Sequence, residues 1–274
     1  MKTIADCRKL SVELEAVSAT ARLDVDVLLA WTLDKDRTFL YSRPETQLTV
    51  IQHQQFTAAL ERRKQREPVA YITGTQEFWS LPLLVDRSTL IPRADTEVLV
   101  ETALNLVDST ATVLDLGTGS GAIALALATE KPHWQIVAVD KSAEAVALAT
   151  KNRQRLGLAN VGLMVSDWFA ALPQQRFDLI VSNPPYVNAT ERQLDLMFEP
   201  ASALVAAEQG LADLKFIIAE ARPYLANRGW LMVEHGWQQG AAVQQQFTVQ
   251  GYHQVRMIKD YSGHDRVTIG QFIG

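Results

Sequence analysis

Four consecutive residues with distinctive chemistry, Asn183, Pro184, Pro185 and Tyr186, follow directly after an apolar run. The two prolines remove two backbone donors and stiffen the turn, which leaves the Pro184 carbonyl free to accept. The Asn183 side chain supplies a second acceptor, so a planar N–H₂ group can give one hydrogen to each and be held in one orientation. Tyr186 can lie against that amide and offer its π surface to a cation. We predict that these four residues are catalytic.

A glycine-rich stretch, with Gly117, Gly119 and Gly121, lies between a short apolar run and an Ala-rich run. This order predicts a strand, a tight loop and a helix whose first N–H groups face a ligand. The first two glycines and Ala122 also satisfy the dinucleotide pattern G-x-G-x-x-G/A, so the glycines alone leave the nucleotide open. The carboxylate of Asp115 would repel the pyrophosphate of a dinucleotide. It suits the ammonium and sulfonium of S-adenosylmethionine, which is therefore the predicted cofactor, with S-adenosylhomocysteine as product.

Two later strand ends add residues to this cofactor site. Asp140 can accept hydrogen bonds from a ribose diol. Trp168 can stack on an adenine ring, with Asp167 accepting from the adenine amino group, or Trp168 can simply belong to the core. No general base stands out among these residues. Methyl transfer from a sulfonium need not use one, because positioning and electrostatics can supply most of the catalysis. The predicted cofactor-binding residues are Asp115, Gly117, Thr118, Gly119, Ser120, Gly121, Asp140, Trp168 and Asn183.

These residues need strands that deliver them to one edge of a sheet. Apolar runs that alternate with helical patterns predict an α/β fold, an open parallel sheet covered by helices on both faces, with ligands at the carboxyl ends of the strands. Strands are expected near 112–116, 135–140, 161–165, 177–182, 230–234, 254–259 and 266–272. Helices are expected near 122–130, 143–156, 211–226 and 238–250, and another, capped by Asp95 or Thr96, ends near Val107.

The first part of the chain has a different pattern. Apolar residues recur at helical spacing through residues 1–70, and Thr49 is a possible N-cap of a helix that ends near Arg66. The basic run 61–66 at its end is either a solvated helix face or a docking surface for an acidic partner. We predict a helical domain at 1–73, a β-hairpin linker at 74–86 and a methyltransferase domain at 87–274.

Composition excludes several classes of protein. The 274 residues, 47% of them hydrophobic, suffice for about two globular domains. A net charge of −5 argues against a stable nucleic-acid partner. Cys7 is the single cysteine, so no internal disulfide forms and no Cys/His cluster has metal spacing. No run has the length of a signal peptide core or a membrane span, so we expect a cytoplasmic protein without membrane contact, and a monomer.

Several segments spread over nearly the whole chain form a distinctive combination. They are Arg66-Glu67-Pro68 with Tyr71 and Gly74, Leu90 to Arg93 with Asp95-Thr96-Glu97, Asp115 to Ala128, Asn183 to Tyr186, Phe198-Glu199-Pro200 with Ala203-Leu204, Glu234-His235-Gly236, Asp260-Tyr261 and Arg266-Val267. In these segments the sequence resembles the HemK-type glutamine methyltransferases that modify peptide chain release factors. That resemblance implies a seven-stranded class I methyltransferase sheet with a small N-terminal helical domain that helps to dock the substrate. It also implies methylation of the side-chain amide nitrogen of the glutamine in the release factors' Gly-Gly-Gln motif.

Two departures from the family pattern concern substrate gripping. Ala94 stands where a proline is common, and only Val187 to Met197 separates Tyr186 from Phe198. The main alternative function is a DNA adenine methyltransferase, since an exocyclic amine can use the same geometry after base flipping. The acidic charge and the lack of a basic recognition insert argue against it. A nucleotide-binding docking module would make the Asn-Pro-Pro-Tyr segment incidental, and Asp115 disfavours a dehydrogenase.

Overall fold

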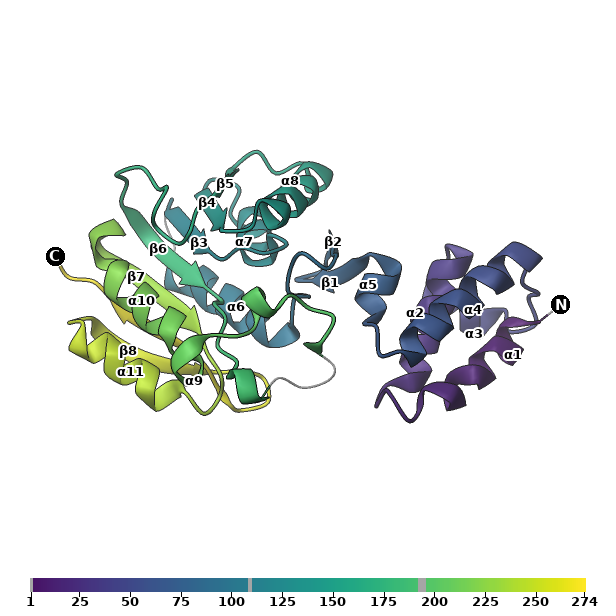
Figure 1. Ribbon diagram of the computed structural model, residues 1–274. Coiled ribbons are helices and arrows are strands. Elements are labelled where there is room, and N and C mark those ends of the chain that lie inside the picture. Colours follow the sequence, from purple (N-terminus) through teal and green to yellow (C-terminus); the bar gives the residue numbers. More distant parts are fainter. Residues whose placement is uncertain (1, 108–109, 192–195) are drawn as a thin grey trace. The chain divides into compact units, whose positions relative to one another are not determined.

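The chain forms two compact units, Met1–Thr75 and Gln76–Gly274, in a computed structural model (Figure 1). The structure describes residues 2–107, 110–191 and 196–274. None of the helices within these ranges is long and apolar enough to cross a membrane.

The first unit is helical, as its sequence pattern predicts. Its longest helix, α4, opens with a capping box in which the Thr49 hydroxyl accepts from the Gln52 N–H and the Gln52 side chain reaches back to the Thr49 N–H. Ile4, Leu28 and Phe56 are fully buried in its separate core. The elements are α1 (Ile4–Arg8), the 3₁₀ helix η1 (Lys9–Leu14), α2 (Ala21–Leu33), α3 (Arg37–Ser42), α4 (Val50–Lys64) and α5 (Val69–Thr73).

The basic run at the end of α4 is paired within this unit. Arg62 Nε lies 2.7 Å from a Glu67 oxygen, and Arg63 Nε lies 2.7 Å from a nearly buried oxygen of Asp24. Such pairs fix the guanidinium groups in internal contacts. The run is therefore more a structural feature of the helical unit than a free basic surface.

The second unit is built on a seven-stranded sheet of order β5-β4-β3-β6-β7-β9-β8 (Figure 1). The first five strands are parallel, but β9 runs antiparallel to both β7 and β8. The expected all-parallel sheet is wrong at this edge because β8 and β9 are joined by a short turn, too short for a parallel crossover. The strands are β3 (Thr112–Leu116), β4 (Gln135–Asp140), β5 (Val161–Val165), β6 (Phe177–Ser182), β7 (Leu225–Glu234), β8 (His253–Lys259) and β9 (Asp265–Gln271).

Two apolar clusters cover the two faces of the sheet. Along β3, Val113 belongs to one cluster and Leu114 to the other, and on β6 Leu179 and Ile180 divide in the same way. This alternation is the period of two of a strand buried on both faces. The helices are α6 (Glu97–Leu106), α7 (Ala122–Glu130), α8 (Ala143–Leu156), α9 (Ala207–Gly210), α10 (Ala212–Glu220) and α11 (Gly240–Val249).

The helix expected at 211–226 is shorter in the structure. α10 ends at Glu220, a 3₁₀ turn spans Arg222–Tyr224, and β7 already begins at Leu225. Pro223 has no N–H to continue the α-helical ladder, which accounts for the early end.

The β-hairpin expected as a linker at 74–86 is present, formed by β1 (Thr75–Phe78) and β2 (Leu81–Leu84), and from Gln76 onward it belongs to the second unit. Phe78 and Leu83 are buried in the core of that unit. The Trp79 N–H donates to Glu97 Oε1 at 2.8 Å, so the turn is fastened to the start of α6. The break between the units falls at residue 75, before these anchoring contacts.

Candidate active site

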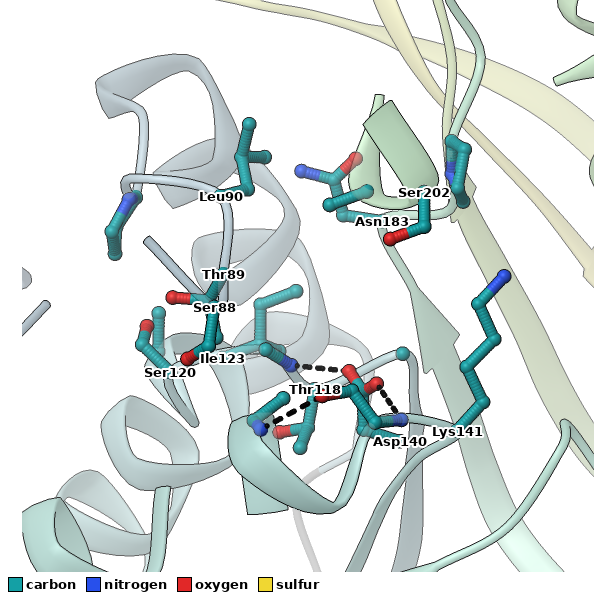
Figure 2. Close-up of a pocket in the computed structure, with 18 of the residues that line it drawn as sticks. Ser88, Thr89, Leu90, Thr118, Ser120, Ile123, Asp140, Lys141, Asn183 and Ser202 are labelled. Atoms are coloured by element: carbon teal, nitrogen blue, oxygen red, sulfur yellow. Dashed lines mark hydrogen bonds between the residues drawn. The ribbon is translucent and has the colours of Figure 1, made fainter. Parts of the chain in front are cut away.

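A cavity opens at the carboxyl ends of β3, β4 and β6, where an open α/β sheet places its ligands. Its empty space is about 920 Å³ when the open mouth is included. Figure 2 shows its walls, with Ser88, Thr89 and Leu90 on one side, Asp140 and Lys141 on the other, and Asn183 and Ser202 above. The cavity brings together eight predicted site residues, which are Gly117, Thr118, Gly119, Ser120, Asp140, Trp168, Asn183 and Pro185.

The glycine loop is held against the neighbouring strand by backbone hydrogen bonds. The N–H groups of Gly117 and Thr118 both donate to the Val139 carbonyl at 2.9 Å. Gly121 has φ +87° as the N-cap of α7, and a Cβ there would lie 2.9 Å from Leu125 Cδ1. Gly121 does not line the cavity, so its need for glycine is conformational and steric and involves no ligand.

Asp115 does not face the cavity. It is fully buried, and its Oδ2 accepts from the Thr118 hydroxyl at 2.6 Å. Burial raises the pKa of this carboxyl to about 7, against the lowering effect of the Thr118 hydrogen bond. The predicted direct attraction between Asp115 and the charges of the ligand must therefore be corrected. Asp115 instead holds the glycine loop in place through its hydrogen bond with Thr118, which lines the cavity.

Asp140 lies at the end of β4 and is itself fixed by two backbone donors. Its Oδ2 accepts from the Gly119 N–H and its Oδ1 from the Ser142 N–H, both at 2.9 Å (Figure 2). A carboxylate has about four acceptor sites, so lone pairs are left for a ligand diol. The carboxylate also ties the glycine loop to the start of α8.

Trp168 belongs to the core and also borders the cavity, where its predicted stacking on an adenine ring stays a prediction. Its ring packs against one core cluster and also lines the cavity. A Cβ at Gly117 would lie 3.4 Å from the ring, so the absent side chain lets the loop and the ring approach closely. The Trp168 carbonyl accepts from the Ser166 hydroxyl at 2.8 Å, which fixes a backbone with φ +49°. An aromatic wall for a planar ring results.

Asn183 is oriented by a residue far away in the sequence. Its Nδ2 donates to Thr96 Oγ1 at 3.1 Å, which leaves Oδ1 as the atom able to accept from a ligand. Thr96 makes no capping hydrogen bond to α6, contrary to the expected N-cap, and lines the cavity instead. Pro184 and Pro185 are buried, and Pro185 alone of the two lines the cavity. Within the described ranges, no group donates to the Pro184 carbonyl.

Tyr186 turns away from the cavity. Its hydroxyl donates to Glu234 Oε1 at 3.0 Å, and its carbonyl accepts from Gln239 Nε2 at 3.0 Å. Burial, chiefly, raises the pKa of the Tyr186 hydroxyl. The ring of Tyr186 is held by Glu234 and does not line the cavity, so this arrangement does not offer the predicted stacking of Tyr186 on the substrate amide.

Residues outside the predicted set complete the wall. Arg93 lines the cavity and pairs with the buried Glu199 at 2.5 Å, and the other Glu199 oxygen accepts from the Ile91 N–H at 2.9 Å. The segments 90–93 and 198–200 are both shared with the family that the sequence resembles, but their contact became visible only in the fold. Residues 192–195 of the short loop lie outside the described residues, and its first residue, Val187, donates to the Leu204 carbonyl at 2.8 Å.

The residues present fit S-adenosylmethionine. Asp140 offers acceptors for the ribose hydroxyls, and Trp168 offers an aromatic face for the adenine. Lys141 adds a cation to the wall, the charge needed opposite the cofactor carboxylate, whereas Arg93 is already paired with Glu199. No group of three or more His, Cys, Asp or Glu that could hold a metal ion occurs in the described part of the chain.

Comparison with known proteins gives two family matches, to the methyltransferase small domain over residues 93–212 and to the PrmC N-terminal domain over residues 7–74. The release factor glutamine methyltransferase of Shewanella oneidensis is 50% identical over 96% of this chain and 93% of its own length. That of Escherichia coli is 49% identical over 97% of both. The chain belongs to the release factor glutamine methyltransferase family.

Solved structures agree with the methyltransferase fold of this family. A methyltransferase from Pyrococcus furiosus matches 80% of this chain and 98% of its own with a TM-score of 0.56 at 19% identity. The hMettl16 catalytic domain matches 78% of this chain and 82% of its own with a TM-score of 0.60 at 17% identity. The class I sheet with an N-terminal helical region is confirmed, and S-adenosylmethionine is the cofactor that suits a methyltransferase. The DNA adenine methyltransferase alternative finds no support among these relatives.

Proposed function

We propose that this protein methylates the side-chain amide nitrogen of the glutamine in the Gly-Gly-Gln motif of peptide chain release factors, and so modulates translation termination. The observation that carries this proposal is the amide of Asn183, held at the cavity wall with its Nδ2 on Thr96 and its Oδ1 left to accept. A planar primary amide is the substrate group that such an acceptor, paired with a nearby carbonyl, orients best.

The residues of the cavity divide the work of binding. S-adenosylmethionine, when bound, supplies a methyl group on a sulfonium with a good leaving group. Asp140 accepts from the ribose hydroxyls while its bonds to the Gly119 and Ser142 N–H groups keep it in place. Trp168 lies against the adenine, and Asp115 holds Thr118 and thereby the loop.

Residues 183–186, the catalytic segment, position the acceptor nitrogen. Asn183 Oδ1 and the Pro184 carbonyl each accept one N–H of the substrate amide, which fixes its plane and turns the nitrogen lone pair toward the methyl group. Because the leaving group drives the transfer, orientation and the electrostatics of the two acceptors account for most of the catalysis. Pro185 closes the wall beside them and helps to keep water away.

The helical unit is proposed to dock the body of the release factor. A glutamine in a short peptide offers few contacts, whereas a folded release factor can also touch this unit, and such remote contacts help to hold the amide. We further infer that the protein acts as a monomer in the cytoplasm, where release factors work. Its net charge of −5 supports the inference that it has no stable nucleic-acid partner.

The direct test is incubation with labelled S-adenosylmethionine and one of three substrates: a release factor, the same factor with Ala in place of the motif glutamine, or duplex DNA. Label in the first alone supports the proposal. If the release factor and its alanine variant take equal label, the modified residue is not the motif glutamine. If DNA takes the label, the protein is a DNA methyltransferase.

The docking role needs a fragment that begins at Gln76, because a start at Asp86 would remove Phe78 and Leu83 from the core. We expect this fragment to lose kcat/KM on whole release factor far more than on a Gly-Gly-Gln peptide, while it still binds cofactor. An equal loss on both substrates in a fragment that binds cofactor would reduce the helical unit to a folding partner.

A further inference from the structure

A buried carboxyl, Glu234, lies directly behind the catalytic segment. It is 1% exposed at the end of β7, where it pairs in register with Val267 of β9. The next residue, His235, donates its N–H to the Arg266 carbonyl at 2.9 Å. The backbone on both sides of Glu234 is therefore fixed in the sheet. Burying a carboxyl here is costly unless donors satisfy it.

The first and last residues of the catalytic segment, Asn183 and Tyr186, are both linked to this carboxyl by hydrogen bonds, Tyr186 directly and Asn183 through Thr96. At one end, the Tyr186 hydroxyl donates to Glu234 Oε1 at 3.0 Å. At the other end, Asn183 Nδ2 donates to Thr96 Oγ1 at 3.1 Å, and the hydroxyl hydrogen of Thr96 is then left to point elsewhere. Among the neighbours that lower the pKa of Glu234, Thr96 has the largest effect, as a hydrogen-bond partner. α6, which begins just after Thr96, packs against β7.

Glu234 has no cation of its own. The nearest guanidinium, Arg266, is engaged by Asp260 at 3.0 Å and by Asp95 at 3.3 Å. Among the residues that the structure describes, no salt bridge involves Glu234, and no hydrogen bond of ordinary geometry reaches its Oε2. Glu234 instead accepts a hydrogen bond from Tyr186, a residue of the catalytic segment.

We infer that Glu234 is a positioning residue for methyl transfer, which holds the ring of Tyr186 and, through Thr96, the amide of Asn183 with Oδ1 turned to accept from the substrate. The inference rests on the proposed function of Asn183. The Tyr186 hydroxyl donates to Glu234 Oε1, and Thr96, which accepts from Asn183, is a hydrogen-bond partner of the same carboxyl, so residue 234 must supply acceptor oxygens. A glutamine keeps one acceptor oxygen there, and an alanine keeps none.

The ionised carboxylate is the form that accepts from both sides. Burial raises the pKa of Glu234 to about 7. The groups facing it are Thr96 and Tyr186, whose hydrogen bonds lower that pKa, Arg266 on β9, which also lowers it, and Asp95 before α6, which raises it. Above about pH 7 both oxygens of Glu234 are therefore acceptors, and below it one of them carries a proton and donates.

The test compares Glu234→Gln and Glu234→Ala with a control, Tyr252→Phe, which removes another buried tyrosine hydroxyl, bonded to the Ile218 carbonyl at 3.0 Å. Single-turnover methylation of a release factor is measured at saturating cofactor and substrate, together with cofactor affinity. We expect a fall of about 100-fold for the alanine variant and about 10-fold for the glutamine variant, with cofactor affinity and the control each within about 3-fold of the parent. The parent rate should rise as the pH passes about 7, and the glutamine variant should lack this inflection.

A second measurement needs no substrate. The side-chain amide signal of Asn183, assigned by its loss in Asn183→Asp, should shift or broaden in Glu234→Ala and stay in place in the control. An unchanged signal, or an alanine variant as fast as the parent, overturns the inference. If the alanine variant does not fold, an unchanged pH inflection in the glutamine variant overturns it. A parent that is inactive on release factors refutes the proposed function alone, because the Asn183 signal still tests Glu234.

Discussion

The stability of this protein should depend on pH through Asp115, and Asp115→Asn should remove that dependence. Asp115 is fully buried beneath the glycine loop, and burial raises its pKa from 3.8 to about 7. Between these two values the folded chain holds a proton that the unfolded chain has released. Folding stability therefore falls as pH rises through this window, since the unfolded state binds fewer protons. Asparagine does not titrate, so the free energy of unfolding of the variant should not fall in this way.

The magnitude follows from the width of the window. The full shift of about 3 units corresponds to about 4 kcal/mol, at about 1.4 kcal/mol for each unit. Between about pH 5.5 and about pH 8, roughly half of the window is crossed, so the parent should lose about 2 kcal/mol relative to Asp115→Asn. Any constant effect of the substitution, such as a weaker bond to Thr118, cancels in this difference.

The assay is urea unfolding of both proteins at the two pH values, followed by tryptophan fluorescence. Five of the six tryptophans lie after residue 75, so the signal reports mainly the unit that contains Asp115. Asp86→Asn, at an exposed turn, controls for the loss of one negative charge. If the free-energy difference between variant and parent stays constant with pH to within about 0.5 kcal/mol, the burial argument fails.

Three further outcomes follow from the site. Asn183→Ala should leave cofactor affinity nearly unchanged and lower the single-turnover rate by about 100-fold, because one positioning acceptor is lost; transfer near the parent rate would contradict the assignment. Asp140→Ala should weaken cofactor binding measured by calorimetry by roughly 2 to 4 kcal/mol, since it removes the ribose acceptor and two bonds that hold the loop; unchanged affinity would mean that another residue holds the ribose. Gly121→Ala should destabilise the fold by about 1 to 3 kcal/mol in urea unfolding, because its Cβ would lie 2.9 Å from Leu125 Cδ1 at a φ of +87°; equal stability would show that α7 shifts freely.

The sequence by itself determined most of the backbone of the second unit. The strands at 112–116, 135–140, 161–165 and 177–182 and the helices at 122–130 and 143–156 have the observed bounds, because their apolar periods and flanking glycines are local signals. The cap at Thr49 was predictable for the same reason. Asn183, Asp140 and the glycine loop reach the cavity because strand ends in an α/β sheet meet at one edge.

Only the tertiary structure decided which way the side chains turn and what they meet. Asp115 and Tyr186 stand in motifs that suggested ligand contact, yet one bonds Thr118 and the other Glu234. The hairpin at 75–84 became part of a core because Phe78 and Leu83 found apolar partners far along the chain. A local pattern fixes backbone conformation through short-range sterics and hydrogen bonds. The partner of a buried polar group is fixed by packing between segments 48 to 87 residues apart, as for Tyr186 with Glu234 and Asn183 with Thr96.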